Sequence, residues 1–543
     1  MGLYAESWLT ELLVALSLVT VAVYAWFSNS YKYWQKKGAP YLEPQFPFGN
    51  IYKSFVGKQP MPMDVTDAYR QLKGGLGPLT HRYLLALTAA HHPTLCSFSF
   101  CIDKVNAAMW QGAGKRFGGI YFFNRPSLVI LDPDLIRTIL VKDFWSFQDR
   151  GFKFDDADPL TKHLFLLGGN KWRRLRVKLS PTFTSGKMKM MFQTILDCGR
   201  ELSDVLEEPA SRGEVMEMRE VGARYTTDII ASVVFGIEVN CQRNPDADFR
   251  QWGRRIFENN MTRTIYEVLR TINPELVKPL RWVFMGESEV SKYFRKMVSD
   301  TVAYREENNV TRNDFMHLLI QLKNKGKITL SIDDVAAQAF VFFAAGFETS
   351  STTMSFALHE LAHHPGIQTR LQEEIDTVLI QNNGQITYDA VNSMQYLDKV
   401  VAETLRKYPP VAALNRESNV EYKIPDSDVV LDKLTPILIP VYGLQHDPEY
   451  FPDPERFDPE RFSEEQKAQR HPYVYLPFGE GPRICIGMRF GLLQTKVGLI
   501  HILSKYNIEP CEKTVRHLSF EPRAFVLTPT GGIQLRLSKR NKA

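Results

Sequence analysis

The chain has 543 residues, of which 44% are hydrophobic, and a formal net charge of +5 at pH 7. This length allows several domains or one large enzymatic fold, and the hydrophobic content is sufficient for an extensive core. The charge is mild and no basic run suggests a nucleic-acid partner. The six cysteines lack the spacing of a disulfide framework, which favours a reducing, cytosol-facing compartment.

An apolar segment near the N-terminus predicts a membrane anchor. Residues Trp8 to Phe27 are mostly apolar, and about 20 such residues are enough for a helix to span a bilayer. The bulky Trp26 and Phe27 at its end do not fit the cleavage site of a signal peptide. Three lysines follow the segment: Lys32, Lys36 and Lys37. Because basic residues stay on the cytoplasmic side, we expect residues 1–30 to be a retained single span and the rest of the chain to be cytoplasmic.

The remainder of the chain divides into a short hinge and a large helical body. Residues 31–50 are basic and rich in proline, which predicts a stiff connection between anchor and body. In residues 51–543 apolar positions recur at the three- and four-residue spacing of helices, most extensively over 331–364. Short strand-like stretches occur at 120–123, 128–131 and 437–442. We therefore expect one domain that is mainly α with small β-sheets.

Residues 75–110 differ from the rest of this domain. They are rich in Leu, Ala, His and Cys, have no clear periodicity, and contain Asp103 as their only acidic residue. An unstructured loop of this length is rare inside a compact domain and belongs at the surface. We interpret the segment as an atypical insertion, which is either a genuine loop or an artefact of splicing or gene prediction.

A glycine-rich loop near the C-terminus carries a single cysteine. It begins at Phe478, contains Arg483 and Cys485, and precedes an apolar, helix-like stretch at 488–500. A thiolate is a soft ligand that suits iron, and the start of a helix stabilises its negative charge. The glycines let the backbone pass close to a flat macrocycle, and Arg483 can bind an anionic propionate. The alternative is a buried, inert cysteine on a glycine turn.

The long helical period at 331–364 carries Gly346, Glu348 and Thr349 near its centre. Glycine in a helix interior costs about 1 kcal/mol relative to alanine, so this position suggests close approach to a ligand and a local opening of the helix. The Thr349 hydroxyl would then face the opening beside Glu348, and an acid and an alcohol together can relay protons. The alternative is an ordinary buried helix whose threonine bonds back to the preceding turn.

A second motif on the same helix matches a different class of enzyme. His359, Glu360 and His363 have the spacing of a zinc protease, with two histidines one turn apart and a glutamate base. Pro365 ends the helix directly afterwards, and no further zinc-ligand motif follows. We therefore consider a zinc protease the less favoured interpretation of this motif.

The Cys485 loop resembles the haem-thiolate loop of the cytochrome P-450 family, which it matches at six residues. The resemblance covers about residues 30–537 apart from 75–110, with the motifs in the family's order. The segment from Leu179 to Met188 is similar to the corresponding segment of insect microsomal members of the family 6 type. The resemblance implies a fold in which haem b lies between the long central helix and the helix after the cysteine loop, with Cys485 as the axial ligand of the iron.

The resemblance also implies further residues that bind the haem. Trp172 and Arg176, one turn apart on a helix, and Arg416 would meet the haem propionates, and Arg150 is a looser candidate. Phe478, Arg483 and Gly346 would complete the cofactor-binding set. The neighbouring Lys171, Arg173, Arg174 and Lys178 would face outward, either as a solvated face or as a docking patch for an acidic electron donor.

A separate group of residues is implied to support the haem loop without touching substrate. Glu403 and Arg406 lie three residues apart on one helical face. In the family an arginine from a later segment locks onto this pair. Two segments of similar sequence follow, and Arg461 of the second is preferred over Arg456 of the first.

The activity implied is that of a monooxygenase in the endoplasmic reticulum membrane, with its catalytic domain in the cytoplasm. Electrons would come from NADPH through a flavoprotein reductase, with cytochrome b5 as a further candidate partner. The substrates would be lipophilic small molecules, with xenobiotics favoured, hydroxylated or epoxidised with the help of Glu348 and Thr349. Four phenylalanines are candidates to line the substrate pocket: Phe152, Phe342, Phe343 and Phe347. Two alternatives stay open, a haem-thiolate isomerase or dehydratase and a haem protein disabled by the insertion.

Overall fold

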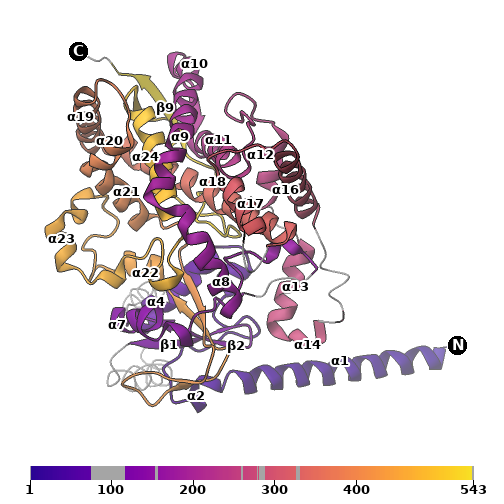
Figure 1. The fold of residues 1–543 in the computed structure, drawn as a ribbon. Coiled ribbons are helices and arrows are strands. Elements are labelled where there is room, and N and C mark those ends of the chain that lie inside the picture. The colour runs from indigo at the N-terminus through magenta and orange to yellow at the C-terminus, as the bar shows by residue number, and fades with distance from the viewer. Residues whose placement is uncertain are drawn as a thin grey trace.

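The computed structural model of the chain describes residues 2–74, 116–152, 157–257, 261–277, 279, 288–325 and 330–540. The main body is mostly helical with small β-sheets, and one long N-terminal helix projects away from it (Figure 1). The prediction of a mainly α fold is therefore confirmed. The segment 75–110, interpreted above as an insertion, lies outside the described residues.

The N-terminal helix α1 (Gly2–Ser30) has the length and composition of a membrane span. Its most apolar stretch has a mean hydropathy of 1.8 and is exposed rather than packed against the body. Near its end, Phe27 packs against Ile51 and Phe123 of the body. Among the described residues α1 is the one helix long and apolar enough to cross a membrane, as the sequence predicted.

The segment after α1 is packed against the first strand, β1 (Phe117–Phe122). Trp34, in the short helix α2 (Tyr33–Lys36), is fully buried, and its indole N–H donates a hydrogen bond to the Ile120 carbonyl at 3.1 Å. Glycine is required at Gly119, because an added Cβ would lie 2.4 Å from the Trp34 ring. Helix α2 of the predicted hinge is therefore packed against the sheet.

Three small sheets lie within the helical body. The largest has the order β1-β2-β7-β4, in which β2 and β7 are parallel and the other neighbours antiparallel. A second sheet has the antiparallel order β3-β9-β8, and β5 pairs with β6. The remaining strand bounds are β2 (Arg125–Ile130), β3 (Val215–Glu217), β4 (Leu414–Glu417), β5 (Tyr422–Lys423), β6 (Val430–Leu431), β7 (Pro436–Ile439), β8 (Tyr506–Pro510) and β9 (Gln534–Lys539).

The helices provide most of the core. In chain order they are α3 (Tyr52–Phe55), α4 (Met61–Leu72), α7 (Pro133–Arg137), α8 (Gly169–Leu179), α9 (Ser185–Val205), α10 (Glu207–Ser211), α11 (Met218–Ile230), α12 (Asp248–Arg255), α13 (Met261–Ile272), α14 (Pro274–Val277), α16 (Glu289–Glu307), α17 (Phe315–Lys325), α18 (Ile332–His363), α19 (Pro365–Gln381), α20 (Tyr388–Ser393), α21 (Gln395–Lys407), α22 (Val441–Gln445), α23 (Glu464–Gln469) and α24 (Met488–Leu503).

The longest helix of the body, α18, runs through its centre (Figure 1). Ser331 and Asp334 form a capping box at its start, which satisfies N–H groups that a helix leaves without partners. Helices α11, α16, α21 and α24 pack around it, and most of its second half is buried. The helix ends at His363, and Pro365 begins α19, as the sequence predicted. This packing brings α24, the helix that follows the Cys485 loop, against α18.

Candidate active site

The Cys485 loop joins a short 3₁₀ turn (Gly481–Arg483) to the start of α24. Gly481 has a φ of 75°, and a Cβ there would lie 2.0 Å from the Leu140 carbonyl oxygen, so only glycine fits. The N–H of Cys485 donates to the Phe478 carbonyl at 2.9 Å and closes the loop. The backbone thus holds the cysteine at a defined place directly before a helix.

The thiol of Cys485 combines an open face with a stabilising environment. The side chain is exposed, yet enough protein surrounds it for burial to raise the thiol pKa. The N–H groups of Gly487 and Met488 and the charges of Arg150 and Arg176 act in the opposite direction and lower this pKa. Amide donors at a helix start and nearby cations stabilise a thiolate. The sulfur is therefore suited to bind a metal ion.

Arg483 is held beside the loop by the backbone. Its guanidinium donates to the carbonyls of Gln148 and Leu167 and lies 4.2 Å from the Trp172 ring. Burial and the charge of Arg150 lower its pKa to about 9. One nitrogen, Nη1, is buried without a hydrogen-bond partner. The structure therefore places Trp172 against Arg483 and leaves one donor of Arg483 free for a ligand.

Three more arginines lie near the same loop. Arg416 is buried, its Nε has no hydrogen-bond partner, and burial together with the charges of Arg150 and Arg483 holds its pKa well below the usual value. Burial also lowers the pKa of Arg150, to about 10, and that of Arg176. The ion pair described for this cluster is a single contact of 3.4 Å from Arg483 to Asp149. The cluster carries more positive charge than its protein partners balance.

These features fit a haem. Buried guanidinium groups are costly unless an anion pairs with them, and the unpartnered N–H groups of Arg416 and Arg483 need acceptors. The two propionates of haem b would supply both, and its iron would accept the Cys485 sulfur. Arg150, a looser candidate from the sequence alone, belongs to this group by its effect on the pKa of Cys485, Arg416 and Arg483.

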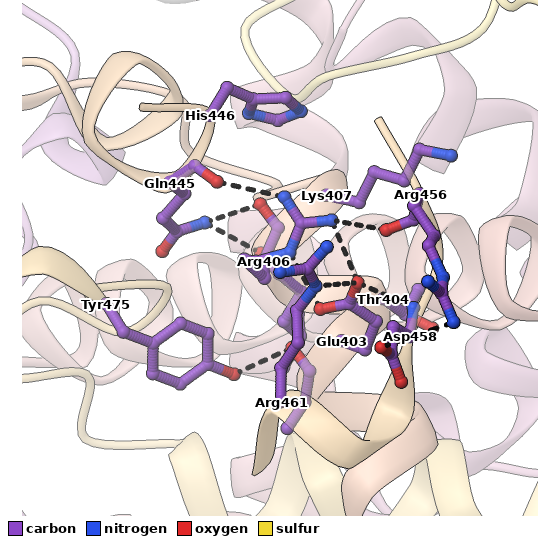
Figure 2. Close-up of polar contacts among 12 residues, drawn as sticks. Glu403, Thr404, Arg406, Lys407, Gln445, His446, Arg456, Asp458, Arg461 and Tyr475 are labelled. Carbon is purple, nitrogen blue, oxygen red and sulfur yellow. Dashed lines mark hydrogen bonds and ion pairs between the residues drawn. The ribbon is translucent and has the colours of Figure 1, made fainter. Parts of the chain in front are cut away.

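A buried ion-pair network supports the region behind the loop (Figure 2). Arg406 donates from Nε and Nη2 to the two carboxylate oxygens of Glu403, at 2.7 and 2.9 Å, and neither side chain is exposed. The N–H of Asp458 donates to Glu403 at 2.9 Å, and Arg461 Nε lies 3.5 Å from the same oxygen. Arg456 points to the surface, with its side chain 67% exposed. The structure therefore places Arg461, and not Arg456, beside the Glu403–Arg406 pair.

Gln445 connects this network to the cysteine loop. Its carbonyl accepts a hydrogen bond from Arg406 Nη1 at 2.9 Å, and its amide donates to the carbonyls of Leu405 and Arg406 (Figure 2). Its side-chain oxygen accepts the N–H of Leu476, two residues before Phe478. Sequence reasoning missed Gln445, because no local pattern reveals that its partners lie on two distant segments.

The centre of α18 differs from the prediction at Gly346. The helix is continuous from Ile332 to His363, so the expected local opening is absent. Gly346 instead permits close packing against α11, since a Cβ would lie 2.5 Å from Ile230 Cδ1. Its carbonyl accepts a hydrogen bond from Gln494 of α24 at 2.7 Å. Tertiary packing between three helices explains the glycine.

Glu348 and Thr349 point to different partners. The Thr349 hydroxyl donates to the Ala345 carbonyl at 2.8 Å, which is the back-bonded arrangement considered as the alternative. Ala345 is nevertheless exposed in the middle of a core helix, so this face borders open space. Glu348 is buried and forms an ion pair of 2.5 Å with Arg219 of α11. The sequence did not reveal Arg219, and the expected pairing of acid and alcohol in one opening is not what the structure holds.

Two of the phenylalanines expected in a substrate pocket belong to the core. Phe343 and Phe347 are buried, and Phe343 contacts the rings of Phe249 and Phe294. The prediction was wrong for this pair because helical spacing alone does not show which face of α18 meets α12 and α16. Phe342 packs against Phe183 and Phe315 instead.

One expected pocket residue does lie on an exposed aromatic surface. Phe152 is partly exposed and stacks on Phe165, with ring centroids 6.0 Å apart. Phe165 in turn contacts Phe525, which comes from the C-terminal part of the chain and is also exposed. The backbone carbonyl of Phe165 accepts a hydrogen bond from Arg150. These rings are therefore joined to the arginine cluster around Cys485.

The zinc-protease motif has a structural explanation. Glu360 is buried, contacts the Tyr408 hydroxyl and forms an ion pair of 2.9 Å with Lys407. The His363 ring bonds to the His359 carbonyl. Within the described part of the chain, no group of three or more His, Cys, Asp or Glu side chains is arranged to hold a metal ion. The motif thus ties the end of α18 to the end of α21.

Comparison with known proteins agrees with the geometry. A sequence model described as Cytochrome P-450 matches residues 107–536. The chain is 40% identical to cytochrome P-450 6k1 of Blattella germanica, an alignment covering 98% of this chain and 97% of the relative. It is 39% identical to cytochrome P-450 6a2 of Drosophila melanogaster, covering 98% and 99%, and 38% identical to cytochrome P-450 6A1 of Musca domestica, covering 98% of each.

The comparison assigns the family and the class of reaction together. The family match covers more than half of the chain, and the relatives align with it over nearly their full lengths. Haem and iron follow from the family and fit the arginine cluster around Cys485. The chain therefore belongs to the cytochrome P-450 family, as a haem-containing monooxygenase of the insect family 6 type.

Proposed function

We propose that the protein is a membrane-anchored monooxygenase that uses NADPH-derived electrons to hydroxylate or epoxidise lipophilic small molecules, with xenobiotics as the favoured class. The observation that carries the proposal is Cys485, an exposed thiol in the loop directly before α24, beside a cluster of arginines that includes Arg150 and Arg176. A peroxide isomerase or dehydratase remains the alternative within haem chemistry. It is disfavoured because such enzymes tend to lack the acid and threonine that Glu348 and Thr349 provide.

Each group of residues has a part in this function. Haem b, when bound, would supply an iron at which dioxygen is reduced and one oxygen atom is passed to the substrate. Cys485 would ligate that iron, while Arg150, Arg176, Arg416 and Arg483 would bind the propionates. The buried Glu403–Arg406 pair, through Gln445, would hold the loop in place. In this division of roles the Cys485 loop and the arginines bind the haem, and the exposed face of α18 contacts the substrate.

Lipophilic substrates are supported by the aromatic surface near the site. Phe152, Phe165 and Phe525 come from two segments far apart in sequence, and Phe152 and Phe525 are exposed. Aromatic rings that remain exposed beside a cofactor site offer apolar contact area to a ligand. The surface favours apolar compounds as a class and does not identify a particular substrate.

Thr349→Ala is expected to separate oxygen insertion from electron use. The hydroxyl of Thr349 lies next to the exposed Ala345 and is the group placed to pass protons on this face. Haem content should stay normal, product formation should fall on the order of a hundredfold, and NADPH should be consumed with release of hydrogen peroxide. Thr349→Ser keeps the hydroxyl and should restore coupling. An unchanged ratio of product to NADPH in Thr349→Ala would remove this residue from proton transfer.

We further propose that an acidic electron donor, the NADPH-dependent flavoprotein reductase with cytochrome b5 as a second candidate, docks on the outer face of α8. Arg173 is exposed there and its guanidinium lies 4.9 Å from the ring of Trp145, which is 54% exposed. Val177 on the same helix is also exposed. Exposed aromatic and cationic side chains side by side are common in protein interfaces.

Arg173→Glu is expected to slow reductase-supported turnover about tenfold at low salt, because charge steers association and like charges repel. Raising the ionic strength should reduce the difference from the unmodified enzyme. Lys296→Glu is the matched control, since Lys296 is an exposed basic residue on another helix, α16. Turnover at several reductase and salt concentrations provides the measurement. Equal effects of the two substitutions would exclude the α8 face as the docking site.

The proposed location is the endoplasmic reticulum membrane, with the body in the cytoplasm. The support is the apolar α1 followed by three lysines, Lys32, Lys36 and Lys37. Measured consumption of NADPH and formation of product with added reductase test the function as a whole. Product formation from peroxides without reductase would favour the isomerase, and haem binding without NADPH consumption would favour a disabled haem protein.

A further inference from the structure

A cavity outside the haem site lies between α9, α17 and the connection from α16 to α17. Its volume is about 130 Å³. An engineered protein cavity of about 150 Å³ binds benzene, so this space suits a molecule with one small ring. Its lining residues belong neither to the Cys485 loop nor to the arginine cluster. Met190, Thr311 and Asn313 are exposed at its rim, so a ligand can enter from solvent.

The lining of this cavity carries an excess of positive charge. Lys187 and Arg312 line it, and within the described residues no carboxylate forms an ion pair with Lys187. Asp314 is the one acidic residue in the lining, and Arg305 donates two hydrogen bonds to its carboxylate, at 2.9 and 2.6 Å. Both side chains of that pair are only 4% exposed. Because the charge of Asp314 is already balanced, the cavity favours an anion.

The start of α9 lies next to the same cations. The helix begins at Ser185 and runs for 21 residues, and Thr184 before it makes no side-chain hydrogen bond to its first turn. The first N–H groups of a helix lack partners within the helix, and its positive end attracts anions. Lys187 is the third residue of α9 and lies in this first turn. The helix therefore adds to the attraction for a negatively charged group near Lys187.

The remaining wall of the cavity is largely apolar. Met190 and Met191 of α9 and Leu318 of α17 contribute to it, and Met191 is buried. The thioether of methionine makes favourable contacts with aromatic rings. An inorganic anion would leave this wall without contacts, whereas a small carboxylate that carries a ring would occupy both the charged and the apolar part.

The cavity is held in shape by contacts within the protein. Arg312 donates from Nη1 to the Gly236 carbonyl at 3.1 Å and from Nη2 to the Ser232 hydroxyl at 3.2 Å. Asp314 accepts the backbone N–H of His317 at 2.9 Å and so joins the connection to α17. Each terminal nitrogen of a guanidinium carries a second N–H, so Arg312 retains donors for a ligand. A preformed site loses less binding free energy to ordering.

We propose that this cavity is a second ligand site that binds a small aromatic carboxylate of about the size of benzoate. The carboxylate would accept hydrogen bonds from Lys187 and Arg312. The ring would lie against the two methionines and Leu318. The inference is independent of the monooxygenase function proposed above, because the two sites share no residue.

Titration of benzoate into the haem-loaded protein tests the proposal by calorimetry. An azole first saturates the haem iron, so that benzoate cannot bind there. One benzoate should then bind to each chain. Benzamide has the same shape without the charge and should bind at least about tenfold more weakly, because a charge-assisted hydrogen bond is lost. Inorganic phosphate has the charge without the ring and should also bind more weakly than benzoate.

Lys187→Glu is expected to weaken benzoate binding about tenfold or more, since it replaces an attractive charge by a repulsive one. Lys187→Arg keeps the charge and should retain most of the affinity. Lys189→Glu is the matched control, because Lys189 is two residues further along α9, is exposed, and pairs with Asp389 at 3.1 Å outside the cavity. Haem content and azole binding should be the same in all of these variants.

The second readout is thermal unfolding of the azole-saturated protein. A ligand that binds only the folded state raises the melting temperature. Benzoate at about ten times its Kd should therefore raise the melting temperature of the unmodified protein and of Lys189→Glu, and at the same concentration should have little effect on Lys187→Glu. Should Lys187→Glu not fold, the comparison of benzoate with benzamide on the unmodified protein decides.

Three results would overturn the proposal: no binding of benzoate to the azole-saturated protein, equal affinity for benzoate and benzamide, or equal losses in Lys187→Glu and Lys189→Glu. Phosphate that binds as tightly as benzoate would likewise contradict an aromatic carboxylate as the ligand. None of these results would affect the monooxygenase function, which is measured at the haem with reductase and NADPH.

Discussion

Arg406→Leu is expected to abolish the recovery of haem-loaded protein. Both members of the Glu403–Arg406 pair are fully buried, and removal of one partner leaves an uncompensated charge in the core, at a cost of about 3–5 kcal/mol. The substitution also removes the donor to the Gln445 carbonyl and thereby the connection to Leu476 before the cysteine loop. Haem content per protein, measured after purification, should fall to background.

Arg456→Leu provides the control for this prediction. Arg456 lies in the similar upstream segment, its side chain is 67% exposed, and its charge contact with Asp458 is 3.8 Å. Surface ion pairs of this kind contribute little, so haem content should remain normal. The double variant Glu403→Leu/Arg406→Leu should recover part of the loss, because the buried Glu403 carboxylate is then no longer left without Arg406. A normal haem content in Arg406→Leu would mean that the network does not support the loop.

Cys485→Ala is expected to remove the spectral signature of a thiolate-bound haem. In the unmodified protein the reduced, carbon-monoxide-bound form should show the red-shifted Soret band that a thiolate ligand produces. The variant has no sulfur in the loop and should lose this band along with all NADPH-dependent oxygenation. The measurement is the carbon monoxide difference spectrum of the reduced protein. Cys485→His offers a different ligand at the same place and should bind haem without the red shift.

Cys198→Ala should leave that spectrum unchanged. Burial raises the pKa of Cys198, and the neighbouring carboxylates of Asp228 and Asp197 raise it further. Burial raises the pKa of Cys485 as well, but that thiol lies beside amide donors and arginines, which stabilise a thiolate, whereas the neighbours of Cys198 are acidic. A retained red-shifted band in Cys485→Ala, or its loss in Cys198→Ala, would contradict the assignment of the iron ligand.

Features encoded by adjacent residues were predictable from the sequence. The Cys485 loop is specified in part by Gly481, whose positive φ and contact with the Leu140 carbonyl leave no room for a side chain, and the end of α18 is specified by Pro365. The span at α1 follows from composition alone. In each case the physical cause lies within a few residues, so spacing and residue type were enough.

Features that depend on distant partners were not predictable. Gly346 suggested an opened helix, but its cause is Ile230 on another helix. Phe343 and Phe347 have the spacing of a helical face, and only the position of α12 and α16 shows that this face is buried. The roles of Gln445 and Arg219 likewise depend on contacts with residues far away in the sequence. A single sequence does not show which of these residues are in contact.

The incorporation of labelled dioxygen tests the central claim most directly. The purified protein, supplied with reductase, NADPH and ¹⁸O₂, should convert members of a panel of lipophilic hydrocarbons to hydroxylated or epoxidised products. Each product molecule should carry one labelled oxygen atom, and one NADPH should be oxidised for each product when coupling is complete. Products without label, formed from peroxides in the absence of reductase, or NADPH oxidation that yields no oxygenated product from any compound, would contradict the account.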